Sequence, residues 1–599
     1  MKKYLVLLLV FVSAMPQMRA QEINGAYQKW HTLSFSFKGP KTEENAQPNP
    51  FTSYRLDILF ENEDEKVWVP GYFAADGDAA NTSASKGHIW RVHFTPNKIG
   101  KWTYKVRFLK GENVAVSDAP ELFESAGFMD GITGEFEISA SDKAADDLRA
   151  KGRLQYNGTR YLRFAETGEV FLKTGADAPE NLLAYQDFDG TFHTDGHKDH
   201  LVKKWEAHLQ DWRTGDPTWQ DGKGKALIGA INYLAAQGMN AFSFLTLNIV
   251  GDDQNVFPYV DYTDYTRFDV SKLAQWEIIF AHGERKGMFL HFKTQEVENQ
   301  GLLDKGDTGR ERRLYYRELM ARFGHHLALN WNLGEENGLW TKRFRTVPQT
   351  TAQRIAMADY FAENDPYQHH LVIHNGQYYD DLLGNKSKLT GISLQTHQVD
   401  FRQVHPHILH WLKASEEAGR PWVVSCDEPG DAKHSLVPDK DNPTHDVARA
   451  AALWGTFMAG GTGVEWYFGY DHEHSDLTCE DWRSRHEMWQ QSRYALQFFR
   501  KLPVDQMIAD DDFVAGKNDY CFYKKGEIYV IYQRKGEAFT VDLPKAKTFN
   551  IRWYNPRTGK FVKAQKAVQG GLQEIAAAPE LDKDWTILIE DAANTQINF

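Results

Sequence analysis

The stretches SKLAQWEIIFAHGERKGMFLHFKTQE (residues 271–296) and RERRLYYRELMARFGHHLALNWNLGEEN (residues 310–337) decide the fold class. Each starts with a run of apolar residues at helical spacing and ends in a short apolar run typical of a buried strand. A helix between two such strands returns the chain to the sheet edge where the next strand starts. Alternating units of this kind therefore predict a parallel sheet.

The same unit recurs along the middle of the chain, over residues 150–505. Eight strand segments alternate there with helical segments; they are VFLKTG, AFSFLTLN, MFLHFKTQE, LALNWNLGEEN, LVIHNG, GISLQTHQ, PWVVSCDEPG and GVEWYFGY. Eight βα units of this length predict an α/β fold, a (β/α)8 TIM barrel with insertions.

Both flanks of this region alternate apolar and polar residues with a period of two. Over residues 21–140, Leu33, Phe35 and Phe37 set the pattern in TLSFSFKG, and over residues 506–599 the runs EIYVIYQR and DWTILIE repeat it. Such alternation predicts half-buried antiparallel strands. We therefore expect a β-sandwich on each side of the barrel, the N-terminal one Ig-like.

The first 20 residues are typical of a secretory signal peptide. Lys2 and Lys3 precede an apolar run over residues 4–12, and Ala20 is a small residue suited to cleavage. No later segment reaches the roughly 18 apolar residues that a membrane span requires. We expect export to the periplasm or outside of a Gram-negative-type bacterium, without a membrane span.

Composition excludes several classes of protein. The formal net charge of −13 and the lack of a basic patch argue against a nucleic-acid partner. Three cysteines and no CxxC or HExxH pattern make a disulfide framework or a structural zinc site improbable. The 18 Trp and 26 Tyr residues suit either β-sheet cores or sugar-binding platforms. The oligomeric state stays open.

Polar residues gather at the C-terminal ends of the predicted barrel strands, where TIM-barrel active sites lie. Amides and imidazoles bind hydroxyl groups, and an indole face stacks on a sugar ring. We therefore predict a carbohydrate site from Asp177, Asn248, His291, Glu296, Glu335, Glu336, Asn337, His374, Asn375, His397, Asp427, Glu428, Glu465 and Trp466.

Two carboxylates at opposite strand ends are what glycoside hydrolysis needs. Glu336 follows strand 4 and Glu428 ends strand 7, across the barrel mouth. A separation of about 5 Å gives retention of configuration, and about 6.5–9.5 Å gives inversion. Asp427 is the alternative nucleophile, and Asp427 or Glu465 is the alternative base of an inverting enzyme. Neither mechanism needs a cofactor.

Three motifs resemble those of clan A glycoside hydrolases. WNLGEEN resembles the strand 4 motif Trp-x-x-Gly-Asn-Glu, VVSCDEPG the strand 7 nucleophile segment, and EWYFG the strand 8 segment. NPFTSYRLDILF, WRVHFTPNKIGKWTYKV and WYNPRTGK resemble a secreted bacterial subfamily of this clan. Its members carry an N-terminal β-sandwich of unknown function and a small C-terminal β domain named for collagen binding. We do not take that name to imply collagen binding.

The resemblance implies a role for several positions. It makes Glu336 the acid/base, Glu428 the nucleophile and Trp466 the floor of the −1 subsite. One residue departs from the family pattern, because Glu335 stands where the family has an asparagine that binds the sugar 2-hydroxyl. Glu335 either takes over that contact or turns outward to pair with a basic neighbour, so the substrate is expected to differ around that hydroxyl.

Several alternatives remain at this point. His291, His374 and His397 suit structural roles as well as substrate binding, and Trp466 suits the core. YDHEHSD, residues 470–476, offers ligands for Ca²⁺ but lacks the glycine and spacing of an EF-hand loop. A polar substrate-facing loop is therefore favoured, and no metal site is assigned.

A further alternative concerns catalysis itself. A non-catalytic carbohydrate-binding protein on a barrel would keep the aromatic residues without two opposed carboxylates. Lys203, Lys204 and Arg213 give a weak indication of an acidic or sulfated glycan, although a solvated face is the commoner explanation.

Overall fold

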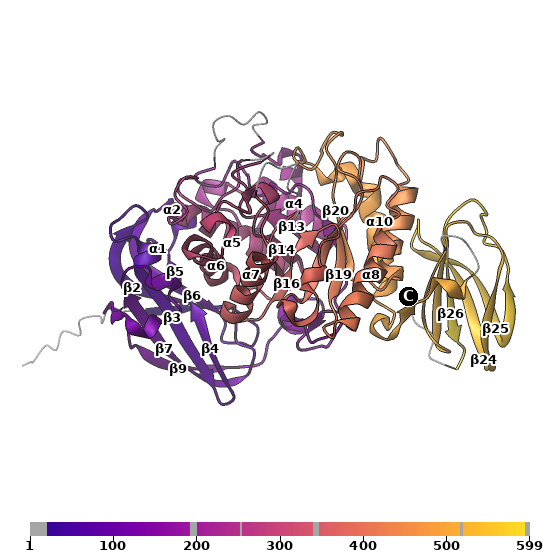
Figure 1. Ribbon diagram of the computed structural model, residues 1–599, viewed down its shortest axis with the longest axis horizontal. Helices are drawn as coiled ribbons and strands as arrows, with labels where there is room; N and C mark the ends of the chain where they lie inside the picture. Colours follow the sequence, from indigo (N-terminus) through magenta and orange to yellow (C-terminus); the bar gives the residue numbers. More distant parts are fainter. Residues whose placement is uncertain (1–20, 192–200, 252–253, 339–346, 515–518, 594–599) are drawn as a thin grey trace, which may run out of the picture.

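Three domains lie in a row in the computed structural model (Figure 1). It describes residues 21–191, 201–251, 254–338, 347–514 and 519–593; the expected signal peptide, residues 1–20, lies outside them. A parallel barrel stands between two antiparallel β domains, which confirms the predicted fold class. Within the described ranges, no helix is both long and apolar enough to pass through a bilayer.

The N-terminal domain consists of two antiparallel sheets. One contains β1 (Gln21–Asn24), β2 (Leu33–Glu43), β6 (Lys86–Phe94) and β5 (Tyr72–Phe73). The other contains β4 (Glu65–Pro70), β3 (Tyr54–Asn62), β7 (Gly100–Lys110), β8 (Glu124–Ser125) and β9 (Thr133–Ile138). Phe60 stacks on Phe94 at 3.9 Å between ring centroids and meets Phe35 at 5.1 Å. Core packing thus accounts for part of the high aromatic content.

The central sheet is entirely parallel. Its strands are β12 (Lys173–Ala176), β13 (Ala241–Leu245), β14 (Phe289–Lys293), β15 (Leu329–Asn332), β16 (His370–Val372), β17 (His374–Asn375), β18 (Gly391–Gln395), β19 (Val423–Glu428) and β20 (Gly463–Trp466). β16 pairs with β15 and β17 with β18, so these two short strands share the fifth strand position on either side of Ile373. The predicted eight positions are thereby filled.

Helices surround the barrel (Figure 1). They are α4 (Lys225–Ala236), α5 (Val270–Arg285), α6 (Arg310–Phe323), α7 (Thr351–Asn364), α8 (Val404–Glu417), the π-helical η9 (Ala448–Trp454) that continues into α9 (Gly455–Met458), and α10 (His486–Phe499). Local sequence sets their starts: Thr350 and Gln353 form a capping box at α7, and Asp269 caps α5. The short helices α1 (Pro50–Ser53), α2 (Ala79–Thr82) and α3 (Leu148–Lys151) and the hairpin β10 (Leu154–Gln155) and β11 (Arg163–Phe164) lie outside the barrel proper.

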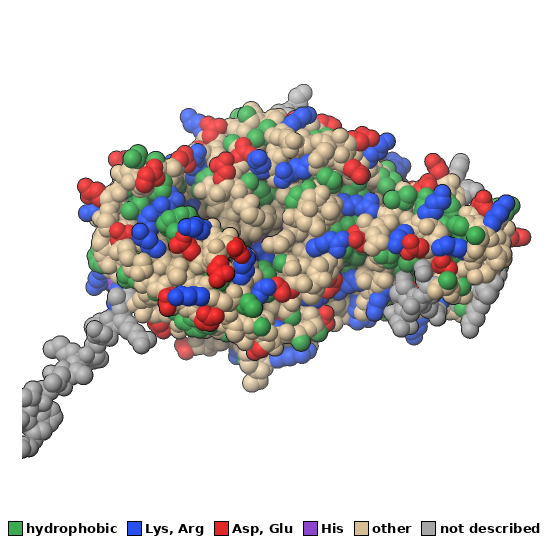
Figure 2. Space-filling model, turned by 90° about the horizontal axis from the view of Figure 1, so that it is seen from below, with side chains coloured by type: hydrophobic (Ala, Val, Ile, Leu, Met, Phe, Trp, Pro, Cys, Tyr) green, Lys and Arg blue, Asp and Glu red, His purple; other side chains and the backbone are tan. Residues whose placement is uncertain are grey.

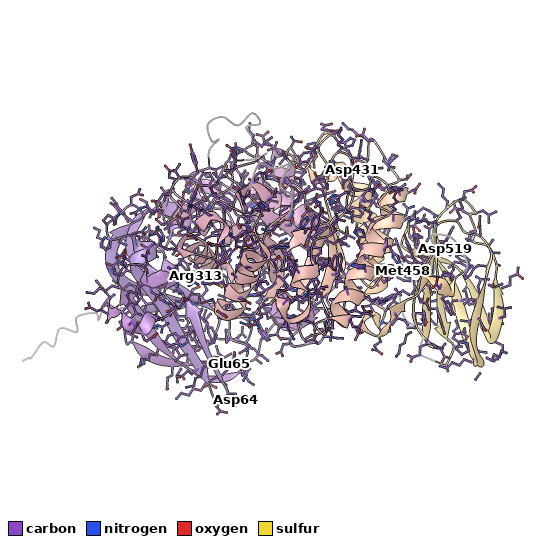
Figure 3. All side chains as sticks on the ribbon, in the orientation of Figure 1. Asp64, Glu65, Arg313, Asp431, Met458 and Asp519 are labelled. Carbon is purple, nitrogen blue, oxygen red and sulfur yellow. The ribbon has the colours of Figure 1, made fainter. Side chains whose placement is uncertain are left out.

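The C-terminal domain is one six-stranded antiparallel sheet rather than two separate ones. Its strands are β21 (Ile508–Ala509), β22 (Tyr520–Lys524), β23 (Ile528–Gln533), β24 (Phe539–Asn555), β25 (Lys560–Ile575) and β26 (Trp585–Asp591). Arg449 of η9 forms two hydrogen bonds, of 2.8 and 2.7 Å, to the Asp584 carboxylate. Met458 marks the side of the barrel that faces this domain (Figure 3). Trp454 stacks on Tyr532 at 5.1 Å, so the contact is apolar as well as ionic.

Charged groups also join the N-terminal domain to the barrel. Arg317 of α6 donates to Asp57 of β3 at 2.8 Å, and Arg313, labelled in Figure 3, pairs with Asp118 at the same distance. The Glu44 carboxylate accepts the Val270 amide of α5 at 2.7 Å. One apolar core extends from this sandwich through the barrel to the C-terminal sheet. On the face drawn in Figure 2, acidic and basic side chains are interspersed.

A buried histidine lies where the N-terminal domain meets the barrel. His326 contacts Glu284 at 3.0 Å and Glu277 at 3.1 Å, beside a cavity of about 430 Å³. Burial alone lowers the pKa of His326, but the two carboxylates outweigh it and raise the pKa to about 10. The imidazolium therefore holds two negative side chains together at neutral pH.

This histidine makes the stability of the protein depend on pH. Because the folded-state pKa is raised, the stabilisation is complete below the unfolded value of about 6.5 and disappears as pH rises towards 10. His326→Gln is expected to lower Tm by about 2–4 °C at pH 6 and by much less at pH 10. Differential scanning fluorimetry across this range, with exposed His88→Gln as control, measures the difference; a pH-independent difference contradicts the assignment.

Candidate active site

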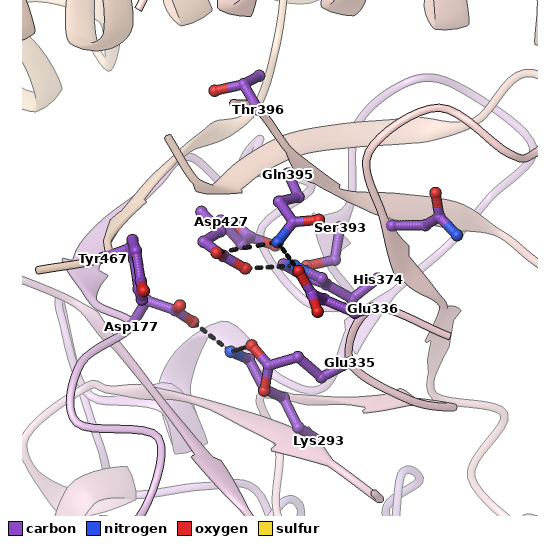
Figure 4. A network of polar contacts seen from close by, with 12 residues as sticks. Asp177, Lys293, Glu335, Glu336, His374, Ser393, Gln395, Thr396, Asp427 and Tyr467 are labelled. Atoms are coloured by element: carbon purple, nitrogen blue, oxygen red, sulfur yellow. Dashed lines mark hydrogen bonds and ion pairs between the residues drawn. The ribbon is translucent and has the colours of Figure 1, made fainter. Parts of the chain in front are cut away.

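The adjacent residues Glu335 and Glu336 both reach the barrel mouth. Glu336 has φ of 44°, in the left-handed region, so the chain departs here from the extended form in which neighbouring side chains point to opposite faces. Glu335 turns towards Lys293, with 2.5 Å between Oε1 and Nζ, whereas Glu336 Oε1 accepts from Gln395 Nε2 at 2.6 Å (Figure 4). The turn at Glu336 therefore gives two adjacent carboxylates different partners.

A register shift directs the end of β19. Leu394 pairs with Cys426 and Gln395 with Glu428, so Asp427 is an extra residue between them. An extra residue in one strand re-aims the side chains that follow it. Asp427 accordingly points into the barrel and Glu428 to its mouth, although they are neighbours in the chain.

One amide connects the two predicted catalytic residues. Gln395 Nε2 donates to Glu336 Oε1 at 2.6 Å and to Glu428 Oε1 at 3.0 Å. These two carboxylate oxygens cannot lie farther apart than the sum of the two distances. A limit of this size on one oxygen pair accommodates the separation of about 5 Å between carboxyl groups that is typical of retaining enzymes.

His374 orients the other oxygen of Glu428. Its Nε2 lies 2.8 Å from Glu428 Oε2, and its Nδ1 lies 2.9 Å from Ser393 Oγ. Burial lowers the pKa of His374, which favours a neutral imidazole. We assign the proton to Nε2, because a carboxylate can only accept while the Ser393 hydroxyl can donate to Nδ1. Glu428 thus receives at least one hydrogen bond on each oxygen.

Lys293 is a buried cation beside this pair. Its Nζ lies 2.7 Å from Asp177 Oδ1 and 2.5 Å from Glu335 Oε1. Although burial opposes the charge, these carboxylates raise the pKa of Lys293 well above its usual value. Burial in turn raises the pKa of Asp177 to about 6, despite Lys293 and a 2.6 Å bond from Ser243. Glu335 therefore pairs with a basic neighbour as predicted, but inside the barrel rather than by turning outward.

Deeper in the barrel, further charges neutralise one another. Lys173 Nζ lies 2.6 Å from Glu465 and 2.9 Å from Asp427, and His291 Nδ1 lies 2.7 Å from Glu465. Asp427, Glu465 and His291 are fully buried. These contacts suit structural roles for all three residues, and the choice of Glu428 over Asp427 as nucleophile stays a prediction.

Trp466 occupies a different position from the one predicted. Its indole N–H donates to Ser492 of α10 at 3.0 Å, and the side chain is fully buried between barrel and helix. Strand alternation explains this, because Glu465 points inward and its neighbour must point outward. Trp466 therefore cannot form the floor of a sugar subsite. Tyr467, the next residue, lies near Asp177 (Figure 4).

The remaining predicted residues brace the loops around the mouth. Asn248 accepts from Asn299 at 3.1 Å, and Asn337 donates to Gln349 at 2.6 Å. Asn375 donates to the Asn337 carbonyl at 2.7 Å. The backbone N–H of the half-buried His397 donates to Gln403 Oε1 at 2.9 Å. These contacts position the site, and a direct role in substrate binding stays a prediction.

Four residues of the site were not predicted from the sequence. Lys293 shares a strand face with His291, two positions apart in MFLHFKTQE, and Gln395 and Ser393 lie at the end of GISLQTHQ. The strand-end rule that selected His and Glu would have found Lys293 and Gln395 if it had included lysine and glutamine. Asp476, from YDHEHSD, is fully buried near Asp177 and Glu335.

Comparisons with known proteins agree with this layout. Residues 26–109 match a family described as "Domain of unknown function (DUF5060)", and residues 502–590 match one described as "Putative collagen-binding domain of a collagenase". The two flanking domains of the predicted subfamily are therefore present. The comparison with curated proteins gave no match.

Three solved structures share the fold. A Bacteroides vulgatus protein described as a "putative glycoside hydrolase" is 14% identical with a TM-score of 0.60, covering 94% of this chain and 99% of its own. A glycoside hydrolase family 5 protein of Bacteroides vulgatus is 15% identical with a TM-score of 0.55, covering 75% and 96%. A third, called "Glycoside hydrolase", is 13% identical with a TM-score of 0.53, covering 74% and 98%. At these identities the likeness establishes the fold.

Proposed function

We propose that this protein is an exported glycoside hydrolase that cleaves a polysaccharide or oligosaccharide with retention of configuration. The observation that carries the proposal is the Gln395 amide, which donates to Glu336 and Glu428 at once and holds the two carboxylates close together. The likeness in fold to proteins named glycoside hydrolases supports it.

The proposed reaction has two steps. Glu428 attacks the anomeric carbon while Glu336 gives its proton to the departing glycosidic oxygen, and a glycosyl–enzyme ester forms. Glu336 then takes a proton from water, the water oxygen attacks the anomeric carbon, and Glu428 leaves as a carboxylate. His374 and Gln395 hold Glu428 in line for both steps.

Glu336 suits the acid/base role better than its neighbour. Glu335 also offers an oxygen within 4.8 Å of His374 and Glu428, so proximity does not separate the two. Glu335, however, forms an ion pair with Lys293 inside the protein, and a proton on this carboxyl would break that pair. Glu336 accepts a hydrogen bond from the neutral amide of Gln395, and this contact tolerates both protonation states of the carboxyl.

The charges around the pair favour a neutral or cationic glycan. Lys293 already pairs with Asp177 and Glu335, and Asp476 lies near both, so no ammonium among these groups is left to bind an anionic sugar. Lys203 gave the weak indication of an acidic glycan. It is buried, and its ammonium donates a hydrogen bond to the Leu477 carbonyl. It therefore braces the loop that carries Asp476.

A panel of plant, algal and host polysaccharides tests the function. We expect the purified protein to release reducing ends from at least one glycan, and Glu336→Gln to reduce that release strongly. On a responding glycan, proton NMR of the first-formed product should detect the anomer of the substrate. The opposite anomer first would contradict retention and support the inverting alternative.

The non-catalytic alternative gives a different result in the same assay. A carbohydrate-binding protein would bind a glycan of the panel without releasing products, and Glu428→Gln would leave that binding unchanged. Binding without turnover for every glycan bound would therefore overturn the proposal.

A further inference from the structure

We infer that the loops after β12, β14 and β15 form a site for one divalent cation, with Glu180, Glu296 and Glu335 as ligands. The chemistry of the ligands points to Ca²⁺. This inference goes beyond the proposed hydrolase function and does not require it.

The geometry suits a single ion. Glu180, Glu296 and Glu335 each offer a carboxylate oxygen, and these three oxygens lie within 4.8 Å of one another. Calcium binds oxygen at about 2.3–2.6 Å, so one ion between the three can reach them all. All three side chains are buried and come from different strand-end loops. The cluster is therefore built by the barrel rather than by one exposed acidic segment.

A second observation is independent of this cluster. Asp476 is 1% exposed, and neither of its carboxylate oxygens has a hydrogen-bond partner among the described residues. Glu335 Oε2 likewise has no partner within the described ranges. Buried carboxylate oxygens without partners are costly, and a cation removes that cost.

The local charge balance leads to the same conclusion. Lys293 brings one positive charge and already contacts Asp177 and Glu335. Asp476 interacts with both of these carboxylates and adds a third acidic side chain to the one ammonium. By contrast, Asp427 and Glu465 deeper in the barrel surround the Lys173 ammonium, so that cluster needs no ion.

Oxygen ligands select the kind of cation. The cluster offers carboxylates without sulfur or imidazole, which suits hard ions such as Ca²⁺ better than zinc or copper. A protonated amino group of a sugar could meet the same charges, so the experiment has to separate these two sources.

The test uses the full chain after treatment with a chelator. We expect added Ca²⁺ to raise Tm by at least about 2 °C, and isothermal titration calorimetry to give one site per chain. Glu180→Gln and Glu296→Gln should each weaken Ca²⁺ binding at least tenfold. Glu473→Gln, an isosteric change at an exposed carboxylate of the same loop as Asp476, should leave it unchanged.

The outcomes are separable from hydrolysis, because binding is measured without substrate. An unchanged Tm with Ca²⁺, Mg²⁺ and Mn²⁺, and no binding heat, overturns the inference even if the enzyme is active. A Tm increase with glucosamine but not with N-acetylglucosamine or Ca²⁺ also overturns it and assigns the cluster to an amino sugar. Calcium binding that persists equally in both variants places the ion elsewhere and contradicts the assignment.

Discussion

Glu428→Gln is expected to lower kcat on a responding glycan by about 10³-fold or more. The amide has the shape of the carboxylate but cannot form the glycosyl ester. It keeps a group between His374 and Gln395, so we expect Tm to stay within about 1 °C of the wild-type value. Initial rates and differential scanning fluorimetry on the same preparations measure both effects.

A neighbouring variant provides the matched control. Asp427→Asn changes the adjacent carboxylate, which pairs with Lys173 inside the barrel. It should lower Tm yet keep kcat within about tenfold, the reverse of the Glu428→Gln pattern. With Glu428→Ala, added azide should restore turnover and give a glycosyl azide of inverted anomeric configuration. If Glu428→Gln kept full activity while Asp427→Asn was inactive but stable, Asp427 rather than Glu428 would be the nucleophile.

Lys293→Met is expected to lower the free energy of unfolding by about 3–5 kcal/mol at pH 8, because Asp177 and Glu335 lose their buried counter-charge. Asp177 has a pKa of about 6, above its unfolded value of about 3.9. The contribution of Asp177 to stability is present below its unfolded-state pKa and is lost as pH rises through its folded-state pKa. The variant should therefore be less impaired at pH 5 than at pH 8.

Urea unfolding at both pH values measures this difference. Lys440→Met is the control, since Lys440 forms an exposed pair with Glu473, and such pairs contribute at most about 1 kcal/mol. An equal loss of stability for Lys293→Met and Lys440→Met would show that the buried carboxylates do not depend on Lys293.

Repetition made the fold predictable from sequence. Eight apolar strand segments, each followed by a helical pattern, leave little choice but a barrel, and the strand-end rule located Glu336 and Glu428. The alternation of side chains along a strand could also have predicted that Trp466 points out of the barrel, because its neighbour Glu465 points inward and pairs with Lys173. The resemblance to the strand 8 motif predicted instead that Trp466 forms the floor of the −1 subsite, which its burial against α10 contradicts.

Backbone irregularities set the rest of the site, and sequence patterns do not reveal them. The register shift at Asp427 and the left-handed Glu336 each change which way a side chain points. The break at Ile373, where β16 ends and β17 begins, is a third. Each depends on contacts between distant parts of the chain, such as that of Gln395 with Glu428.

In the described part of the chain, one apolar core passes through all three domains and packs them against one another. A glycan segment held on either β domain would lie at a set distance from Glu428, because this packing opposes reorientation of the domains around the barrel. The row of domains in Figure 1 would then set the spacing between a glycan-binding surface on a β domain and the barrel mouth. Only glycans whose length and branching match that spacing could engage a β domain and the catalytic pair at the same time.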